Sequence, residues 1–123
     1  MSQFETPFSH QTPLFYYAPE LFDIEDAKNN EPSSIKFNRV CVWIIGIIIS
    51  ELISGVIPWQ NVSTNETKVK LCINKKKPFP IPDVINSYPE IKDLIEKCTK
   101  IIPNDRCNID YIVESLRKIN TIV

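Results

Sequence analysis

The chain has 123 residues, of which 43% are hydrophobic and 24% are charged, as is usual for one globular domain. Its formal net charge is −1, so the charge balance favours neither nucleic acid nor an anionic membrane as a partner. No basic stretch followed by an apolar segment opens the sequence, so we expect no secretory signal and a cytoplasmic protein.

The cysteines and the histidine do not predict a metal site. The four cysteines stand at positions 41, 72, 98 and 107, and no two of them have the Cys-x-x-Cys spacing. His10 is the only histidine and is near none of them in sequence. We expect reduced thiols and no bound metal.

The N-terminal third is predicted to contain little regular structure. Pro7, Pro13 and Pro19 prevent a continuous helix over residues 1–22, which should be extended or turn-like, with a flexible stretch at 1–10. Residues 23–37 are polar and favour an exposed loop.

Residues 38–54 are predicted to form a helix that is apolar on every side. Asn38 is a candidate N-cap, and Gly55 and Pro58 end the pattern. The uninterrupted apolar run from Val40 to Ile49 is about half of the ~20 residues that a membrane span requires. We therefore expect a core helix that is covered all round by protein.

Three further helices are predicted, which makes the fold class mainly α. The first spans 65–74 with Thr64 or Asn65 as its cap, and a proline-rich connector follows at 78–82. The second spans 89–100, with apolar residues at helical spacing. After a turn at 103–105, Asn108 caps the last helix. We expect no strand of consequence.

Several short motifs occur in a fixed order. They are TPLFYYAPE at 12–20, VWIIGIIISEL at 42–52, GVIPW at 55–59, LIEKC at 94–98, PNDR at 103–106 and IVESL at 112–116. In this order the chain resembles the second half of the C-terminal lobe of eukaryotic protein kinases, and it is most similar to the tyrosine-kinase-like branch. The resemblance covers residues 11–120, with 121–123 as a tail. It implies a partial helical bundle without the N-terminal lobe.

The resemblance implies structural roles for single residues. Thr12 and Pro13 correspond to the segment that shapes the peptide-substrate site, and residues 18–20 close the activation segment. The central helix of the lobe corresponds to 38–54, with Cys41, Trp43 and Gly46 at its motif positions.

The same resemblance pairs two charged residues, Glu20 and Arg106. Glu20 lies among apolar residues, and a buried carboxylate requires a partner. A guanidinium can supply two parallel hydrogen bonds to it. We therefore expect an ion pair between these two side chains.

The catalytic motifs of the family are not in the sequence. A protein kinase needs a Gly-rich loop, a lysine for ATP, a catalytic aspartate and asparagine, and a metal-binding aspartate. In the family these precede Ala-Pro-Glu, and only 17 residues precede Ala18. We expect no catalytic, cofactor-binding or metal-binding residue here, and ATP and Mg would belong to a parent kinase domain. Cys41 also replaces a family aspartate, and Ile44 a small polar residue.

Three hypotheses about function follow. The first is a non-catalytic, kinase-derived module that binds a protein partner. The partner would cover the apolar face of the central helix left exposed by a missing family helix, and would dock beside Pro58 and Trp59. The alternative is a truncated piece of an active ATP-dependent serine/threonine kinase. The third is a remnant without a selected function.

Overall fold

The computed structural model describes residues 14–21 and 37–122, and helices are the only regular elements in these ranges. The predicted mainly α fold is confirmed. The expected flexible stretch, the polar loop and the pair Thr12 and Pro13 lie wholly or almost wholly outside the described residues. The elements, in chain order, are η1 (Leu14–Tyr16), α3 (Phe37–Ser54), α4 (Glu66–Asn74), η3 (Asp83–Ser87), α5 (Pro89–Cys98), η4 (Pro103–Asp105) and α6 (Ile109–Ile122).

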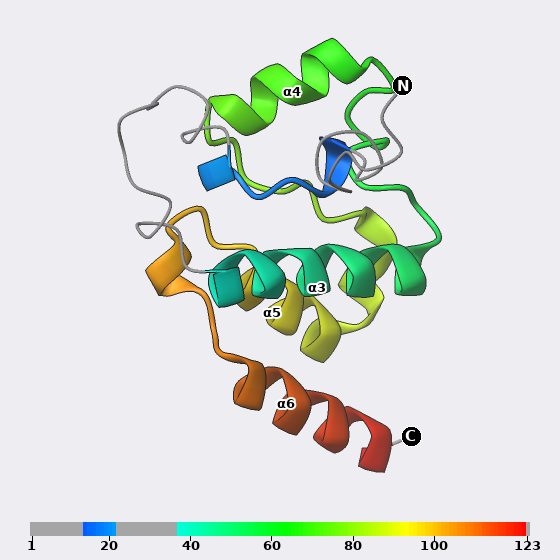
Figure 1. Ribbon diagram of the computed structural model, residues 1–123. Helices are drawn as coiled ribbons and strands as arrows, with labels where there is room; N and C mark the ends of the chain where they lie inside the picture. The colour runs from blue at the N-terminus through cyan, green and yellow to red at the C-terminus, as the bar shows by residue number, and fades with distance from the viewer. Residues whose placement is uncertain (1–13, 22–36, 123) are drawn as a thin grey trace, which may run out of the picture.

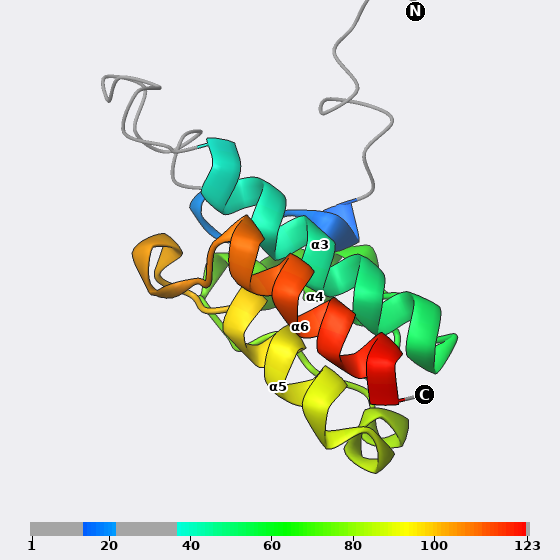
Figure 2. The same ribbon diagram turned by 90° about the horizontal axis from the view of Figure 1, so that it is seen from below.

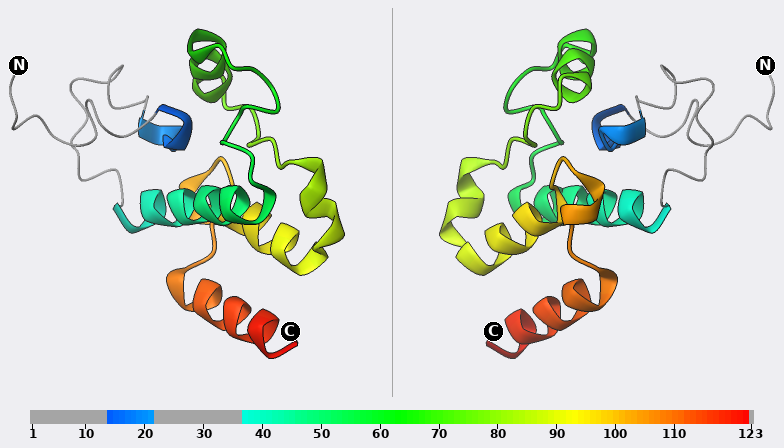
Figure 3. Two further views of the ribbon diagram at one scale, coloured as in Figure 1. Left: turned by 90° about the vertical axis from the view of Figure 1, so that its right-hand side faces the viewer. Right: turned by 90° about the vertical axis from the view of Figure 1, so that its left-hand side faces the viewer.

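Helix α3 lies in the middle of the bundle (Figure 1). Helix α4 and the segment 14–21 lie on one side of it, and α6 lies on the other (Figure 3). Helix α5 packs along α3, and α6 runs beside both of them (Figure 2). The other three α-helices of the described residues therefore lie around α3, as expected for a central helix.

The ends of α3 are only partly as predicted. The helix begins at Phe37, so Asn38 lies inside it and is not its N-cap, which corrects the prediction. It ends where expected, because Gly55 adopts a φ of +74° and donates its N–H to the Glu51 carbonyl at 2.8 Å. A positive φ after the last turn is what glycine permits at low cost.

Two asparagine caps were predicted correctly. The Asn65 Oδ1 accepts a 3.2 Å hydrogen bond from the Lys68 N–H at the start of α4. The Asn108 Oδ1 accepts a 2.8 Å bond from the Tyr111 N–H at the start of α6. Helix α5 is two residues shorter than predicted, because the Thr99 hydroxyl donates to the Ile95 carbonyl at 2.7 Å as the backbone leaves the helix.

The apolar side chains form two clusters on different sides of α3. The smaller cluster joins α3, α5 and α6 through Val42, Leu94, Cys98 and Ile112. The larger cluster joins α3 to the segment 14–21, to α4 and to the connectors. Its buried members are Ala18, Val40, Trp43, Ile47, Trp59, Val69, Ile73, Phe79, Ile85, Ile91 and Ile95.

One stripe of α3 is covered by neither cluster. Phe37, Ile48 and Leu52 are exposed by 67%, 43% and 77%, and they lie on one face of the helix together with the partly exposed Cys41. Within the described residues, α3 is the one helix long and apolar enough to cross a membrane by length and composition. The described residues therefore do not cover α3 on all sides, and the exposed apolar face that the missing family helix led us to expect is present on α3.

Candidate functional site

The predicted pair of Glu20 and Arg106 is present at the centre of the structure. The two guanidinium nitrogens Nη1 and Nη2 of Arg106 each donate to one carboxylate oxygen of Glu20, at 2.7 Å. The Arg106 side chain is fully buried, and that of Glu20 is 11% exposed. This bidentate geometry is the strong form of the arginine–carboxylate interaction.

Arg106 also binds three backbone carbonyls. Its Nε donates to Lys100 at 2.8 Å, its Nη1 to Arg39 at 2.8 Å and its Nη2 to Ile101 at 3.5 Å. With the two bonds to Glu20, all five N–H donors of the guanidinium have an acceptor. One side chain thus joins the Ala-Pro-Glu segment, the start of α3 and the loop between α5 and η4.

The indole of Trp43 completes the surroundings of this arginine. The guanidinium carbon of Arg106 lies 5.0 Å from the Trp43 ring centroid, within the range of a cation–π contact. The Phe79 ring meets Trp43 edge-on, with the centroids 6.5 Å apart. The indole Nε1 of Trp43 is buried and has no hydrogen-bond partner among the described residues. Among the described residues, Trp43 therefore stabilises the structure through the contacts of its ring and not through its N–H.

Gly46 allows α3 and α5 to approach closely. A Cβ placed on Gly46 would lie 2.5 Å from the Cys98 Cβ and 3.1 Å from the Thr99 Cγ2. Side-chain carbons do not approach so closely, so only glycine fits without a shift of α5. The expected scaffold role of Trp43 and Gly46 has a direct structural explanation.

Cys41, the third motif position of the central helix, is placed differently. Its side chain is partly exposed and lies on the uncovered stripe of α3. A thiol is a weak hydrogen-bond donor, in contrast to the carboxylate of an aspartate, which accepts several bonds. At this position the helix therefore has a thiol where the resemblance described above implies an aspartate.

A contact that the sequence analysis missed joins Tyr16 and Glu51. The Tyr16 hydroxyl donates to the Glu51 Oε1, which ties η1 to the last turns of α3. Burial, and then the hydrogen bond to this carboxylate, raise the pKa of Tyr16 to about 12. Glu51 itself was the available signal, because a carboxylate that interrupts an apolar helix requires a partner.

The predicted docking surface at Pro58 and Trp59 is wrong. Both side chains are buried, and Trp59 is 2% exposed. The Trp59 ring packs edge-on against Phe79, with centroids 5.9 Å apart, so the proline-rich connector covers it. The burial of a large aromatic ring is favourable enough to draw Trp59 into the core, although it lies in an irregular segment.

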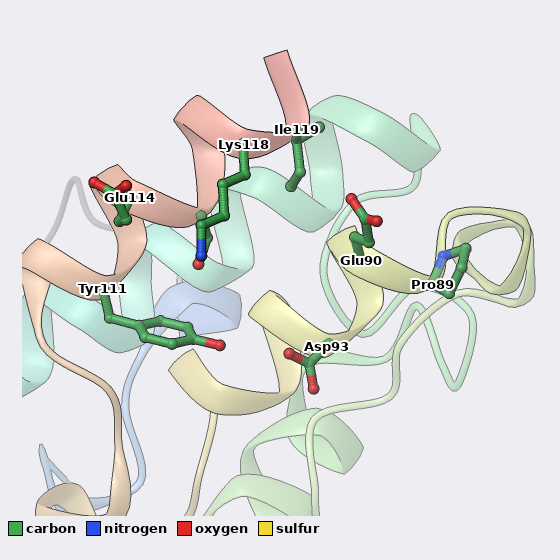
Figure 4. Close-up of a pocket in the computed structure, with 8 residues that line it drawn as sticks. Pro89, Glu90, Asp93, Tyr111, Glu114, Lys118 and Ile119 are labelled. Atoms are coloured by element: carbon green, nitrogen blue, oxygen red, sulfur yellow. The ribbon is translucent and has the colours of Figure 1, made fainter. Parts of the chain in front are cut away.

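Helices α5 and α6 enclose an open cavity of about 410 Å³ (Figure 4). Asp93 at its wall pairs with Lys97 at 2.9 Å, and the same lysine donates to the Tyr111 hydroxyl at 2.7 Å. These two hydrogen bonds raise the pKa of Lys97. The other lining residues mix both charges, and no group of three or more metal-ligating side chains exists within the described residues.

Helix α6 also carries exposed apolar side chains. Ile109, Val113 and Leu116 are exposed by 41–43%. On the helix they lie on the opposite side of buried Ile112 from the cavity-lining Tyr111 and Ser115. We define the uncovered apolar face as Phe37, Ile48, Leu52, Ile109, Val113 and Leu116.

Comparison with known proteins agrees with this geometry. Residues 3–116 match the family model described as protein tyrosine and serine/threonine kinase. The chain belongs to this family, and its described part is a helical fragment of the kinase domain. The model covers both tyrosine and serine/threonine enzymes, so the tyrosine-kinase-like branch stays a prediction.

The curated relatives include kinases and a scaffold protein. The chain is 27% identical to a probable serine/threonine-protein kinase of Dictyostelium discoideum, over 88% of the chain and 28% of that protein. It is 26% identical to Scaffold protein ILK of Homo sapiens, over 96% of the chain and 25% of that protein. It is 25% identical to Dual specificity protein kinase Ttk of Danio rerio, over 82% of the chain and 10% of that protein. The chain thus spans about a quarter or less of these relatives.

Proposed function

We propose that this chain is a non-catalytic part of a protein kinase domain that acts through contact with another protein. The observation that carries the proposal is the contrast between its interior and its uncovered face. The ion pair of Glu20 and Arg106 is complete, whereas the exposed residues of the uncovered apolar face have no cover among the described residues. Apolar patches of several hundred Å² are characteristic of surfaces that bind a partner.

The absence of catalytic motifs from the printed sequence supports the non-catalytic part of the proposal. The chain has two glycines, Gly46 and Gly55, so it contains no Gly-rich phosphate loop. Gly46 is occupied in packing against Cys98. ATP and Mg have no residues of the family pattern to bind in these 123 residues.

We further propose that the cover of this face is protein and not lipid, and that the chain is cytoplasmic. Glu51 and Arg39 are charged residues of α3 that bond to Tyr16 and to the Arg106 carbonyl. Ionisable groups of this kind are costly inside a bilayer. The four cysteines are free, as in a reducing compartment.

The alternative is that the same segment belongs to an active serine/threonine kinase, whose remaining domain covers the face. The match to a probable serine/threonine-protein kinase supports it, because the chain spans 28% of that relative. The transcript upstream of the Met1 codon distinguishes the two. An open frame that encodes the catalytic-loop and Asp-Phe-Gly motifs supports the alternative, and an in-frame stop supports the non-catalytic chain.

The uncovered face can be tested on the purified chain. We expect wild-type chain to self-associate in light scattering and to bind a dye for exposed apolar surface. Replacement of Ile48 and Leu52 by glutamate should abolish both signals. The matched control replaces Leu71 and Val84, which are exposed by 51% and 48% outside this face, and should behave as wild type.

Two results would contradict the proposal. A monodisperse wild-type monomer that binds no dye would refute the partner-binding face. Phosphate transfer from ATP to a protein substrate above the buffer control would refute the non-catalytic assignment.

A further inference from the structure

Two cysteines face each other where the chain passes from α5 to α6. Cys98 is the last residue of α5 and is fully buried, whereas Cys107 follows η4 and is partly exposed. Their Sγ atoms are 3.8 Å apart. The Cys107 N–H donates to the Lys97 carbonyl at 3.0 Å, so the backbone on either side of the thiols is already held together.

We propose that Cys98 and Cys107 form an oxidisable dithiol site that a peroxide converts to a disulfide. The S–S bond of a disulfide is about 2.05 Å long, so the sulfurs must approach by about 1.8 Å from their 3.8 Å separation. Cys98 is held in place, because its Cβ packs directly against Gly46. The partly exposed side chain of Cys107 lies outside any helix, so rotation of this side chain supplies the movement.

The exposure of the two thiols sets the order of the chemical steps. The partly exposed sulfur of Cys107 attacks the peroxide, forming a sulfenic acid and one molecule of water. The sulfur of Cys98 then attacks the Cys107 sulfur, and the departing hydroxide takes the Cys98 proton as a second molecule of water. The two thiols lose two electrons and the peroxide gains them, so the step is balanced.

Burial, and then the neighbouring Cys107, raise the pKa of Cys98. A thiol held protonated reacts slowly with peroxide, because the thiolate is the nucleophile. Cys98 is therefore the second thiol to react, and its proton passes to the hydroxide that leaves Cys107 as the S–S bond forms.

The disulfide would close a loop that contains part of the surroundings of the central ion pair. Arg106 is adjacent to Cys107, and its acceptors at Lys100 and Ile101 lie between the two cysteines. Closing so short a loop removes chain entropy from the unfolded state. We expect oxidation to raise Tm by roughly 5 °C.

Peptide mapping tests the site directly. The 123-residue chain is treated with hydrogen peroxide under native conditions, the remaining thiols are alkylated, and trypsin is added. Cleavage after Lys97, Lys100, Arg106 and Arg117 places the two cysteines in the peptides 98–100 and 107–117. We expect these peptides joined by a disulfide, and separated again by a reductant.

Two variants serve as controls. Cys107→Ser should remove the linkage and the rise in Tm, and Cys72→Ser should keep both, since Cys72 has a different place on α4. The proposal is overturned if Cys98 pairs mainly with Cys41 or Cys72. It is equally overturned if Cys107 reaches the sulfinic acid while Cys98 remains an alkylatable thiol.

Discussion

Glu20 and Arg106 are joined by two hydrogen bonds of 2.7 Å across 86 positions of sequence. The guanidinium has no remaining donor, and its side chain has no exposure to solvent. The pair therefore joins the Ala-Pro-Glu segment to the residues that precede α6. Its energetics follow the rule for buried ion pairs, in which removal of one partner strands the other.

Arg106→Ala should destabilise the chain by about 3–5 kcal/mol, because it leaves the Glu20 carboxylate buried without its partner. Chemical denaturation monitored by helical circular dichroism measures the change. Arg117→Ala is the matched control, since the Arg117 side chain is 75% exposed, and it should change stability by less than about 0.5 kcal/mol. Equal stability of the Arg106 variant and wild type would show that the pair is not formed.

Trp43→Phe should cost far less than Trp43→Ala. The phenylalanine keeps an aromatic face toward Arg106 and removes an indole N–H that has no partner among the described residues. The alanine leaves a cavity and should cost about 3–5 kcal/mol. The same denaturation experiment compares them, and similar losses for both variants would mean that the indole N–H is in fact bonded.

Gly46→Ala should destabilise by about 1–3 kcal/mol, because the new Cβ would meet the Cys98 Cβ at 2.5 Å. A double-mutant cycle with Cys98→Gly isolates this contact. The second substitution removes the opposing Cβ, so part of the loss should be recovered in the pair. Strictly additive losses would contradict a steric origin.

The stability of the chain should decrease as pH rises from about 10 to about 12. Tyr16 has an ordinary pKa near 10, and burial raises it to about 12 in the folded state. Over this interval the unfolded chain loses the phenolic proton while the folded chain keeps it, so alkaline pH favours unfolding. Below pH 10 the contribution of Tyr16 to stability is fully present.

Tyr16→Phe should flatten this part of the pH profile, as measured by thermal melts across the interval. Glu51→Gln should lower the pKa of Tyr16 in a tyrosinate absorbance titration, because it removes the charge beside the hydroxyl. If the tyrosinate titration of the Glu51 variant is the same as that of wild type, Glu51 does not raise the pKa of Tyr16.

The helices were predictable from sequence because their signals are local. The side chains of Asn65 and Asn108 each accept a hydrogen bond from the N–H three positions later. The sequence signal and the bond that it predicts therefore lie within one helical turn. The pair of Glu20 and Arg106 is not local, and its prediction depended on the order of motifs resembling the kinase family. No local rule connects two residues so far apart.

The failures of prediction arose where burial depends on distant segments. Trp59 was expected at the surface, but Phe79 of the connector covers it. Tyr16 was not expected to meet Glu51, because nothing near Tyr16 in sequence indicates a contact with the end of α3. Phe37 begins the central helix one residue early, since helix boundaries depend on preceding residues as well as on a capping side chain.

The five hydrogen bonds of Arg106 have a consequence for how the chain acquires its structure. Their acceptors belong to residues 20, 39, 100 and 101, all of which are made before residue 106 during synthesis. Helices α3, α4 and α5 can form as soon as they emerge from the ribosome, but the carboxylate of Glu20 has no partner until Arg106 has been made. The pair of Glu20 and Arg106 spans 86 positions of sequence, so it can form only after residue 106 has been made.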